Sequence, residues 1–192
     1  MRIGVLALQG AFAEHVAILC QLKVEALPVR LPEELKGLDG LIIPGGESTS
    51  ISKLMLDYNL MDKIRNLAKN GLSILGTCAG MILLASEISD PGVEPLRVMD
   101  ITVKRNAFGR QRDSFETELS MPALGEKPFP GVFIRAPLIE QTSNGVEILA
   151  RLTDGTSVAA RQGKLLTSAF HPELTDDPRF HQYFLDIASG RQ

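Results

Sequence analysis

The chain of 192 residues contains no tryptophan, only two cysteines, only three histidines and no long hydrophobic run. With Cys20 and Cys78 alone, a disulfide framework cannot be the main source of stability, which favours a reducing, cytoplasmic setting. The first apolar run, residues 3–8, is far shorter than the roughly 20 residues of a membrane span, and no small-residue cleavage site follows it. The sequence therefore argues against a membrane protein and against a disulfide-rich secreted protein.

A strong charge of either sign is also missing. The 20 basic and 23 acidic residues are spread along the chain and give a net charge of -3. This distribution provides no positive field for nucleic acid or anionic lipid, so neither partner is expected. No Cys and His pairs show metal-ligand spacing, and no Walker-type lysine follows Gly45 and Gly46. We therefore expect no metal site, no phosphate loop and no cofactor.

The first ninety residues alternate between short apolar runs and helical stretches. The predicted strands are residues 3–8, 24–29, 38–43 and 72–75, and the predicted helices include residues 11–23 and a segment from Ser48 to residue 70. Ser48, Thr49 and Ser50 offer N-caps to the second helix. This alternation favours a parallel sheet with helices on both faces.

After residue 92 the pattern changes to shorter segments with period-two alternation, separated by proline and glycine. These segments predict antiparallel strands at 101–103, 115–119, 146–149, 157–160 and 165–170, before a closing helix at 178–189. A chain of this length with 44% hydrophobic residues can bury one core. We expect an α/β fold with a mostly parallel central sheet, flanking helices and additional antiparallel strands, in a single domain over residues 1–192.

The stretch GTCAG at residues 76–80 places a cysteine between small residues at the junction of two apolar runs. Its G-x-C-x-G spacing matches the G-x-S-x-G elbow of hydrolases, in which a nucleophile sits on a sharp strand-to-helix turn. At the start of the following helix, unpaired N–H groups and the helix dipole would favour a thiolate at Cys78. The alternative is a buried cysteine in a glycine-bounded turn.

A thiolate nucleophile also needs a base, and His171 in the stretch FHPE is the best candidate. Proline disfavours helical geometry in the residue before it, so His171 should be extended at the end of a strand. Extended residues two apart project to the same side, so Glu173 could orient one ring nitrogen while the other faces Cys78. The alternative is a strand-end histidine beside a solvated glutamate.

The other histidines and the other cysteine show no such pattern. His15 and His181 fall within predicted helices, where a helix-surface or packing role is expected. Cys20 lies near the apolar stripe of the first helix and is expected to be an inert core thiol.

An acyl-transfer site further needs donors for the developing oxyanion. The N–H of Ala79, directly after the nucleophile, is one candidate. The second is the loop at residues 44–48, where Gly46 permits close approach of the backbone to a ligand. The alternative for this loop is a simple turn and helix cap.

These residues carry a resemblance to a known family. GTCAG and FHPE resemble the class I, triad-type glutamine amidotransferases, whose fold is flavodoxin-like. A narrower resemblance is to the glutaminase subunits of pyridoxal 5'-phosphate synthase. It rests on LALQGAFAEH at 6–15, PGGEST at 44–49, RNAFGRQRDSFE at 105–116, FIRAP at 133–137 and FHPELT at 170–175. One departure is at residues 96–99, where a glycine-containing turn would be expected.

The resemblance implies hydrolysis of L-glutamine to glutamate and ammonia by a triad of Cys78, His171 and Glu173, through a thioester on the cysteine. It also implies further residues around the substrate. Gly46, Glu47 and Ser48 would contact glutamine, Gly46 and Ala79 would form the oxyanion hole, and Arg105, Ile134 and Arg135 would help to bind substrate. From composition alone the arginines would be ordinary surface residues, although a guanidinium can pair with the carboxylate of a free amino acid. The segment 105–116 could equally serve a protein interface.

A partner is expected as well, since ammonia released into neutral water is mostly protonated and no longer nucleophilic. The resemblance implies delivery to a separate synthase subunit, a TIM barrel, and glutaminase activity only in the docked state. Two alternatives remain. One is the glutaminase subunit of another amidotransferase, such as an imidazole-ring synthase, and the other is a non-catalytic thiol protein, a redox sensor or chaperone with an elbow cysteine. The segments 105–116 and 133–137 argue against the first, and the pair of His171 and Glu173 argues against the second.

Overall fold

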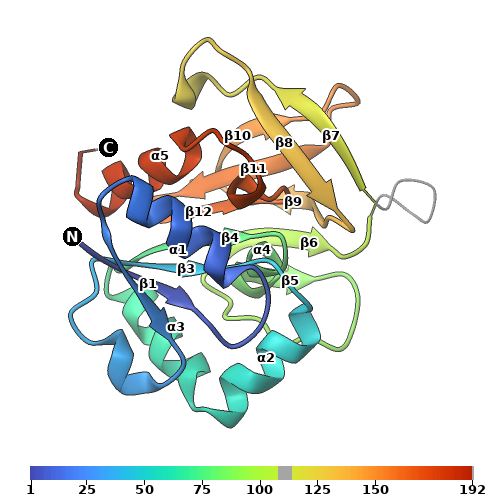
Figure 1. The fold of residues 1–192 in the computed structure, drawn as a ribbon. Coiled ribbons are helices and arrows are strands. Elements are labelled where there is room, and N and C mark those ends of the chain that lie inside the picture. Colours follow the sequence, from blue (N-terminus) through green and yellow to red (C-terminus); the bar gives the residue numbers. More distant parts are fainter. Residues whose placement is uncertain (108–113, 192) are drawn as a thin grey trace.

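The computed structural model describes residues 1–107 and 114–191, and a ten-stranded sheet runs through the centre of this part of the chain (Figure 1). The strand order is β2-β1-β3-β4-β12-β11-β9-β6-β5, with β10 paired to β11. The first five strands in this order are parallel to one another. From β12 onward, β11, β9 and β6 pair in antiparallel fashion, and β5 is parallel to β6.

The predicted strands of the parallel half are all present. They are β1 (Arg2–Leu6), β2 (Glu25–Val29), β3 (Gly40–Ile43) and β4 (Ser73–Thr77). The strand predicted as antiparallel at 165–170, β12 (Leu165–Ser168), is antiparallel to β11 but parallel to β4, so it also belongs to the parallel half. The central strands β3, β4 and β12 are buried along their whole length, which explains why they read as unbroken apolar runs. The remaining strands of the sheet are β5 (Ala85–Ile88), β6 (Met99–Lys104), β9 (Leu138–Thr142), β10 (Glu147–Arg151) and β11 (Ser157–Gln162).

Helices cover both faces of the sheet (Figure 1). On one face α1 (Phe12–Gln21) and α5 (Arg179–Ala188) lie together, and on the other lie α2 (Ser48–Asp57), α3 (Leu60–Lys69) and α4 (Ala79–Leu84). Short 3₁₀ turns are η1 (Pro32–Leu35), η3 (Pro122–Leu124) and η4 (Pro172–Leu174). The predicted α/β fold, a mostly parallel sheet with added antiparallel strands, is confirmed.

A separate two-stranded ribbon, β7 (Ser114–Leu119) and β8 (Phe129–Ile134), lies beside the antiparallel half of the sheet (Figure 1). Four buried aromatic rings pack together where this ribbon contacts the rest of the molecule. Phe129 and Phe133 of β8 contact Phe170, and Phe129 and Phe170 contact Phe180 of α5, with centroids 5.3 to 6.0 Å apart. Such ring contacts hold the ribbon against the end of β12, where the sequence places His171.

Two local predictions are wrong. The single helix predicted over residues 48–70 is two helices, because Asn59 adopts a left-handed backbone (φ 57°) that interrupts the first and starts the second. Asparagine tolerates this conformation better than most residues. Cys20, predicted to be a core thiol, is exposed on α1, because the buried face of that helix is formed by His15, Ile18 and Leu19.

The packing of α4 against β3 requires glycine at position 80. A Cβ atom at Gly80 would overlap the carbonyl oxygen of Ile43, which is backbone and cannot move aside. We predict that Gly80→Ala lowers the free energy of unfolding by about 1 to 3 kcal/mol, because the added methyl group overpacks the contact with β3. At a helix position without such a contact, replacing glycine by alanine would instead raise the free energy of unfolding by about 1 kcal/mol. Urea denaturation measures the difference. A more stable variant would contradict the observed packing.

Candidate active site

Cys78 lies at a sharp turn between β4 and α4. Its backbone is in an uncommon region for a non-glycine residue (φ 50°, ψ -103°). The N–H of Cys78 donates to the carbonyl of Ser168 at 2.8 Å, and its own carbonyl accepts the N–H of Met81 at 3.1 Å. Strained backbone of this kind persists where the surrounding structure fixes it, and it clusters at functional sites. The elbow that the sequence indicated is thus present.

His171 lies next to Cys78 because β4 and β12 are parallel neighbours. Thr77 pairs with Ser168 in the sheet, so the two strands end together. The N–H of His171 donates to the carbonyl of Val132 on β8 at 2.8 Å. Gly45 lies against both side chains, since a Cβ atom there would overlap the His171 ring and approach Cβ of Cys78 to 3.3 Å. The structure therefore brings the cysteine, the histidine and the loop at 44–48 to one place.

Glu173 is buried behind His171, with Oε1 2.7 Å from Nδ1 of the imidazole. The expected reason for this contact is wrong, however. Residues 172–174 form the 3₁₀ turn η4 and not an extended segment, so the turn, not strand alternation, directs Glu173 toward the ring. The remaining ring nitrogen, Nε2, is the one left to face Cys78.

The surroundings of His171 favour its charged form. Burial lowers the pKa of this imidazole, but its interactions with Cys78 and Glu173 outweigh burial and raise the pKa to about 10. At neutral pH both ring nitrogens of His171 therefore carry protons. The arrangement is a cysteine beside an imidazolium that is hydrogen-bonded to a carboxylate.

The loop at 44–48 is held by three hydrogen bonds. The N–H of Gly45 donates to Oγ1 of Thr77 at 3.1 Å, and the carbonyl of Gly45 accepts the N–H of Ala11 at 3.0 Å. The N–H of Glu47 donates to Oε1 of Gln9 at 2.8 Å. Gln9 was not singled out from the sequence, although it belongs to the LALQG stretch. Gly46 lies between these anchored residues and is exposed to solvent.

The N-cap of α2 is Glu47, and the prediction of a Ser or Thr cap is wrong. Its carboxylate accepts the N–H groups of Thr49 at 3.1 Å and Ser50 at 2.6 Å. Burial raises the pKa of Glu47, but these hydrogen bonds outweigh it and lower the pKa to about 2. Nη2 of Arg105 lies 3.8 Å from Oε1 of Glu47, so this arginine is next to the loop at 44–48. Ser48 is buried in the first turn of α2.

The remaining predicted site residues are Ile134, Arg135 and Ala79, in the segments that meet or follow Cys78. The carbonyl of Ile134 is 3.9 Å from Sγ, and the Ile134 side chain is exposed. Arg135 follows with a left-handed backbone (φ 44°) and an exposed side chain. Ala79 is the first residue of α4, where an N–H group has no partner within the helix. Residues 108–113 of the segment 105–116 lie outside the described residues.

His15 and His181 lie in helices as expected, but neither lies on a surface. Both are fully buried between α1 and α5, with Nδ1 of His15 2.8 Å from Nε2 of His181. His15 also approaches Glu173, with its Nε2 3.4 Å from Oε2. Sequence spacing could not reveal this contact, because the three residues come from elements far apart in the chain.

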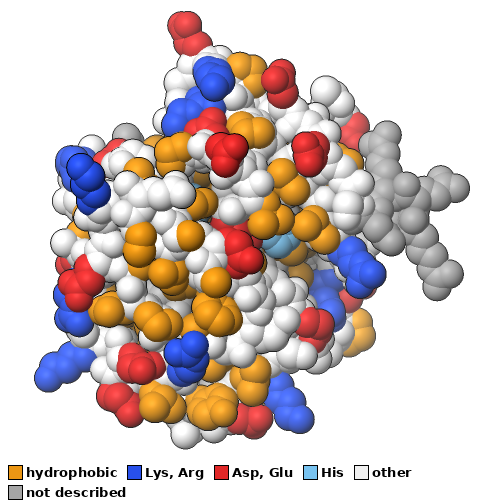
Figure 2. Space-filling model, in the orientation of Figure 1, with side chains coloured by type: hydrophobic (Ala, Val, Ile, Leu, Met, Phe, Trp, Pro, Cys, Tyr) orange, Lys and Arg blue, Asp and Glu red, His pale blue; other side chains and the backbone are white. Residues whose placement is uncertain are grey.

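The site can be reached from solvent. On the face shown in Figure 2, a small area of histidine surface is visible between hydrophobic side chains, with acidic and basic side chains scattered over the rest of that face. His171 is 7% exposed, whereas His15 and His181 are 0% exposed. The His171 side chain thus reaches the molecular surface, whereas the other two histidines do not.

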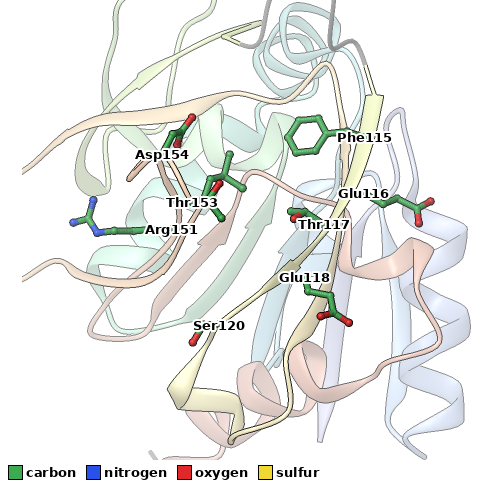
Figure 3. Close-up of a pocket in the computed structure, with 9 residues that line it drawn as sticks. Phe115, Glu116, Thr117, Glu118, Ser120, Arg151, Thr153 and Asp154 are labelled. Carbon is green, nitrogen blue, oxygen red and sulfur yellow. The ribbon is translucent and has the colours of Figure 1, made fainter.

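A separate cavity of about 510 Å³ lies between β7 and the turn that follows β10 (Figure 3). Phe115 and Thr117 point toward that turn, and Glu116 and Glu118 point to the other side of the strand, as period-two alternation requires. Arg151, which also lines it, donates to Ser157 at 2.7 Å. None of the predicted site residues lines this cavity, so it is distinct from the site around Cys78.

In residues 1–107 and 114–191, no three His, Cys, Asp or Glu side chains are grouped so that they could hold a metal ion. In the same part of the chain, no helix has the length and apolar character needed to cross a bilayer.

Comparison with known proteins identifies the fold and the family. The fold is that of the class I glutamine amidotransferases: one solved structure, described as the crystal structure of a glutamine amidotransferase, matches with a TM-score of 0.92 and 52% identity, over 97% of this chain and 98% of that one. The chain belongs to the SNO glutamine amidotransferase family, whose sequence model matches residues 5–189.

Two bacterial relatives extend the match to nearly the whole chain. Both are named "Pyridoxal 5'-phosphate synthase subunit PdxT". The protein from Herpetosiphon aurantiacus is 60% identical over 97% of this chain and 100% of its own length. The protein from Dehalococcoides mccartyi strain 195 is 58% identical over 98% of this chain and 97% of its own length.

The raised pKa of His171 predicts how stability depends on pH. Because the folded pKa of about 10 exceeds the ordinary 6.5, the bound proton stabilises the fold fully below pH 6.5, and this contribution is lost as pH rises toward 10. Urea denaturation from pH 6 to 10 should show the free energy of unfolding falling more steeply for the wild type than for His171→Gln. Parallel curves for the two proteins would contradict the charged state assigned to His171.

Proposed function

We propose that the chain is the glutaminase subunit of a pyridoxal 5'-phosphate synthase. It hydrolyses L-glutamine to L-glutamate and ammonia at Cys78 and passes the ammonia to the synthase subunit of the complex. The main support is the position of His171, which is hydrogen-bonded to Glu173 and lies beside Cys78 against Gly45, at the ends of two paired strands. The names of relatives at 58 to 60% identity give the pathway.

In the first half of the reaction the sulfur of Cys78 attacks the side-chain amide carbon of glutamine. A C–S bond forms, and the carbonyl oxygen takes the negative charge. The N–H of Ala79 and an N–H from the Gly46 loop are the proposed donors to this oxyanion. The His171 imidazolium then gives a proton to the amide nitrogen, the C–N bond breaks and ammonia leaves a thioester on Cys78.

In the second half water resolves the thioester. Neutral His171 takes a proton from the water as its oxygen attacks the thioester carbon, and the C–S bond breaks to release glutamate and the thiolate. The imidazolium is restored in this step. Glu173, 2.7 Å from Nδ1, keeps the ring oriented and stabilises its positive charge in both halves.

The substrate would lie between the loop at 44–48 and the carbonyl of Ile134. We propose that Gly46, Glu47 and Ser48 contact glutamine from one side, and that Arg105, Ile134 and Arg135 help to bind it. Glu47 and Arg105 are already close to each other, at 3.8 Å, and each could pair with one charged group of a free amino acid. Glu47 would then use carboxylate lone pairs left over by the α2 cap.

The partner that takes the ammonia is proposed to be a TIM-barrel synthase subunit, in a cytoplasmic complex. A sheltered route matters because free ammonia is protonated in neutral water. The Gly45–Gly46 loop offers a way for docking to control the reaction, because an exposed glycine in such a loop can change backbone orientation at low cost.

Replacement of the proposed nucleophile is the direct test of the reaction. In the presence of the synthase subunit, Cys78→Ala should reduce ammonia release from glutamine to background while leaving the urea denaturation curve nearly unchanged. Cys20→Ala is the matched control, because its thiol is exposed on α1 and should not affect turnover. Turnover by Cys78→Ala above a few per cent of wild type would count against this site.

The dependence on a partner is tested by measuring ammonia release with the chain alone and after mixing with candidate synthase subunits. We expect a low rate for the isolated chain and a stimulated rate with a pyridoxal 5'-phosphate synthase subunit only. If the isolated chain turned over glutamine as fast as the mixture, activation by docking would be wrong. Stimulation by an imidazole-ring synthase instead would reassign the pathway but not the reaction.

A further inference from the structure

Three buried polar side chains lie behind Glu173 and have no role in the reaction described above. They are His15 on α1, Thr77 at the end of β4 and His181 on α5, and all three are fully buried. Buried polar groups cost free energy unless they are paired, so such a cluster needs an explanation.

The three side chains form a chain of contacts that ends at the carboxylate. Nδ1 of His15 is 2.8 Å from Nε2 of His181, and the two rings are tilted by 55° with centroids 5.1 Å apart. Nε2 of His15 lies 3.2 Å from Oγ1 of Thr77 and 3.4 Å from Oε2 of Glu173. The other carboxylate oxygen of Glu173 is the one that contacts His171.

The protons of the two imidazoles can be placed by considering which groups would be left unpaired. If Nε2 of His181 donates to His15, then Nε2 of His15 carries a proton and can donate toward Glu173, and Nδ1 of His181 is left as an unpaired acceptor. If His15 donates to His181 instead, a ring lone pair faces the carboxylate and Nδ1 of His181 becomes a buried N–H without a partner among the described residues. In the first arrangement the O–H of Thr77 has no acceptor among the described residues, because Oγ1 accepts the N–H of Gly45 and its other contact is the protonated Nε2 of His15. Each arrangement therefore leaves one buried donor unpaired. The carboxylate favours the first, because a ring lone pair turned toward a buried carboxylate oxygen is repelled by it.

The same argument applies to Oε2 of Glu173. This oxygen is buried, and apart from the approach of His15 it has no hydrogen-bond partner in the described part of the chain. A buried carboxylate oxygen needs a donor, because an uncompensated buried charge is strongly destabilising. His15 is the side chain that could supply that donor, because its Nε2 is 3.4 Å from Oε2. In the structure this nitrogen is aligned with Oγ1 of Thr77 and not with the carboxylate.

We propose that His15 is a positioning residue: held by His181 with its proton on Nε2, it donates a hydrogen bond to Oε2 of Glu173 and so fixes the carboxylate that orients His171. This inference deepens the proposed glutaminase function and rests on it for its catalytic consequence. The tautomer that it assigns to His15 does not depend on any activity.

Two further observations fit a neutral donor at this place. Burial lowers the pKa of His15 well below its ordinary value, with smaller effects from His181 and His171, and burial lowers the pKa of His181 to about 4. Both rings therefore stay neutral at physiological pH and can hold the carboxylate without cancelling its charge. Thr77, which contacts His15, also accepts the N–H of Gly45 at 3.1 Å, so the cluster reaches the loop beside Cys78.

The first test is the protonation state of His15 in the intact wild-type chain. NMR of protein with ¹⁵N-labelled histidine distinguishes the two tautomers and the imidazolium through the ring nitrogen resonances. We expect at neutral pH a neutral His15 with Nε2 protonated and Nδ1 unprotonated, and the same tautomer at His181. A proton on Nδ1 of His15, or on both of its nitrogens, would overturn the proposal.

The second test compares two amide replacements in the complex with the synthase subunit. The glutamine side chain is one methylene longer than asparagine, so His15→Gln can place its amide N–H where Nε2 stood, whereas His15→Asn reaches only the place of Nδ1. Loss of one hydrogen bond to a charged group should lower kcat of His15→Asn by about 10- to 100-fold. His15→Gln should stay within about threefold of wild type, and KM should change by less than about twofold in both, because His15 does not touch the substrate site.

Equal kcat values for the two variants, whether both normal or both low, would overturn the positioning role, since a purely structural role would not discriminate between them. If His15→Asn does not fold, His181→Phe gives a second variant, in which removal of the donor to Nδ1 should shift the NMR tautomer of His15 away from Nε2–H. An unchanged tautomer there would contradict the proposal. A wild-type complex without glutaminase activity would reject the proposed function, while the NMR result would still decide the tautomer.

Discussion

The candidate active site depends on the register between two parallel strands, β4 and β12. Thr77 lies opposite Ser168, and the N–H of Cys78 continues this pairing by donating to the carbonyl of Ser168 at 2.8 Å. Because parallel strands end at the same edge of a sheet, the cysteine that follows one strand and the histidine that follows the other must be neighbours. The register is set by side chains that are buried on both faces, and a slip of one residue would turn each of them to the opposite side. The position of the sulfur relative to the imidazole is therefore a consequence of core packing.

Around this pair the molecule builds a buried polar region from elements that are distant in sequence. The η4 turn supplies Glu173, the β8 strand holds the backbone of His171, and the loop after β3 brings Gly45 against both reacting side chains. Burying an imidazolium and a carboxylate costs desolvation free energy. The buried pair is stable only if the remaining polar atoms of both groups also have hydrogen-bond partners. The proposed role of His15 answers that requirement for Oε2 of Glu173. Helices α1 and α5, which would otherwise serve only to cover the sheet, then become part of the support of the site.

The sequence was informative where local chemistry decides the structure. Apolar runs identified the buried parallel strands, and the small residues around Cys78 identified the elbow, in which a Cβ at Gly80 would overlap the backbone of Ile43. The sequence was not informative where one unusual backbone conformation, or a contact with a residue distant in the chain, determines the structure. Asn59 splits one predicted helix in two, and Arg97 adopts a left-handed backbone (φ 55°) in the turn where glycine would be expected. The buried contact of His15 with Glu173 joins residues 158 positions apart (173 - 15), so no spacing rule could have indicated it.

The central claim is that the nucleophilic sulfur is that of Cys78, activated by His171, and a glutamine analogue with an electrophilic carbon in place of the amide tests it most directly. Accessibility alone would favour Cys20, which is exposed, over Cys78, which is 7% exposed. Treatment of the complex with the synthase subunit, followed by peptide mass spectrometry, should find the analogue attached to Cys78, with little at Cys20, and labelling at Cys78 should be much slower in His171→Gln. Preferential labelling of Cys20, or a rate at Cys78 unaffected by the loss of His171, would contradict this account.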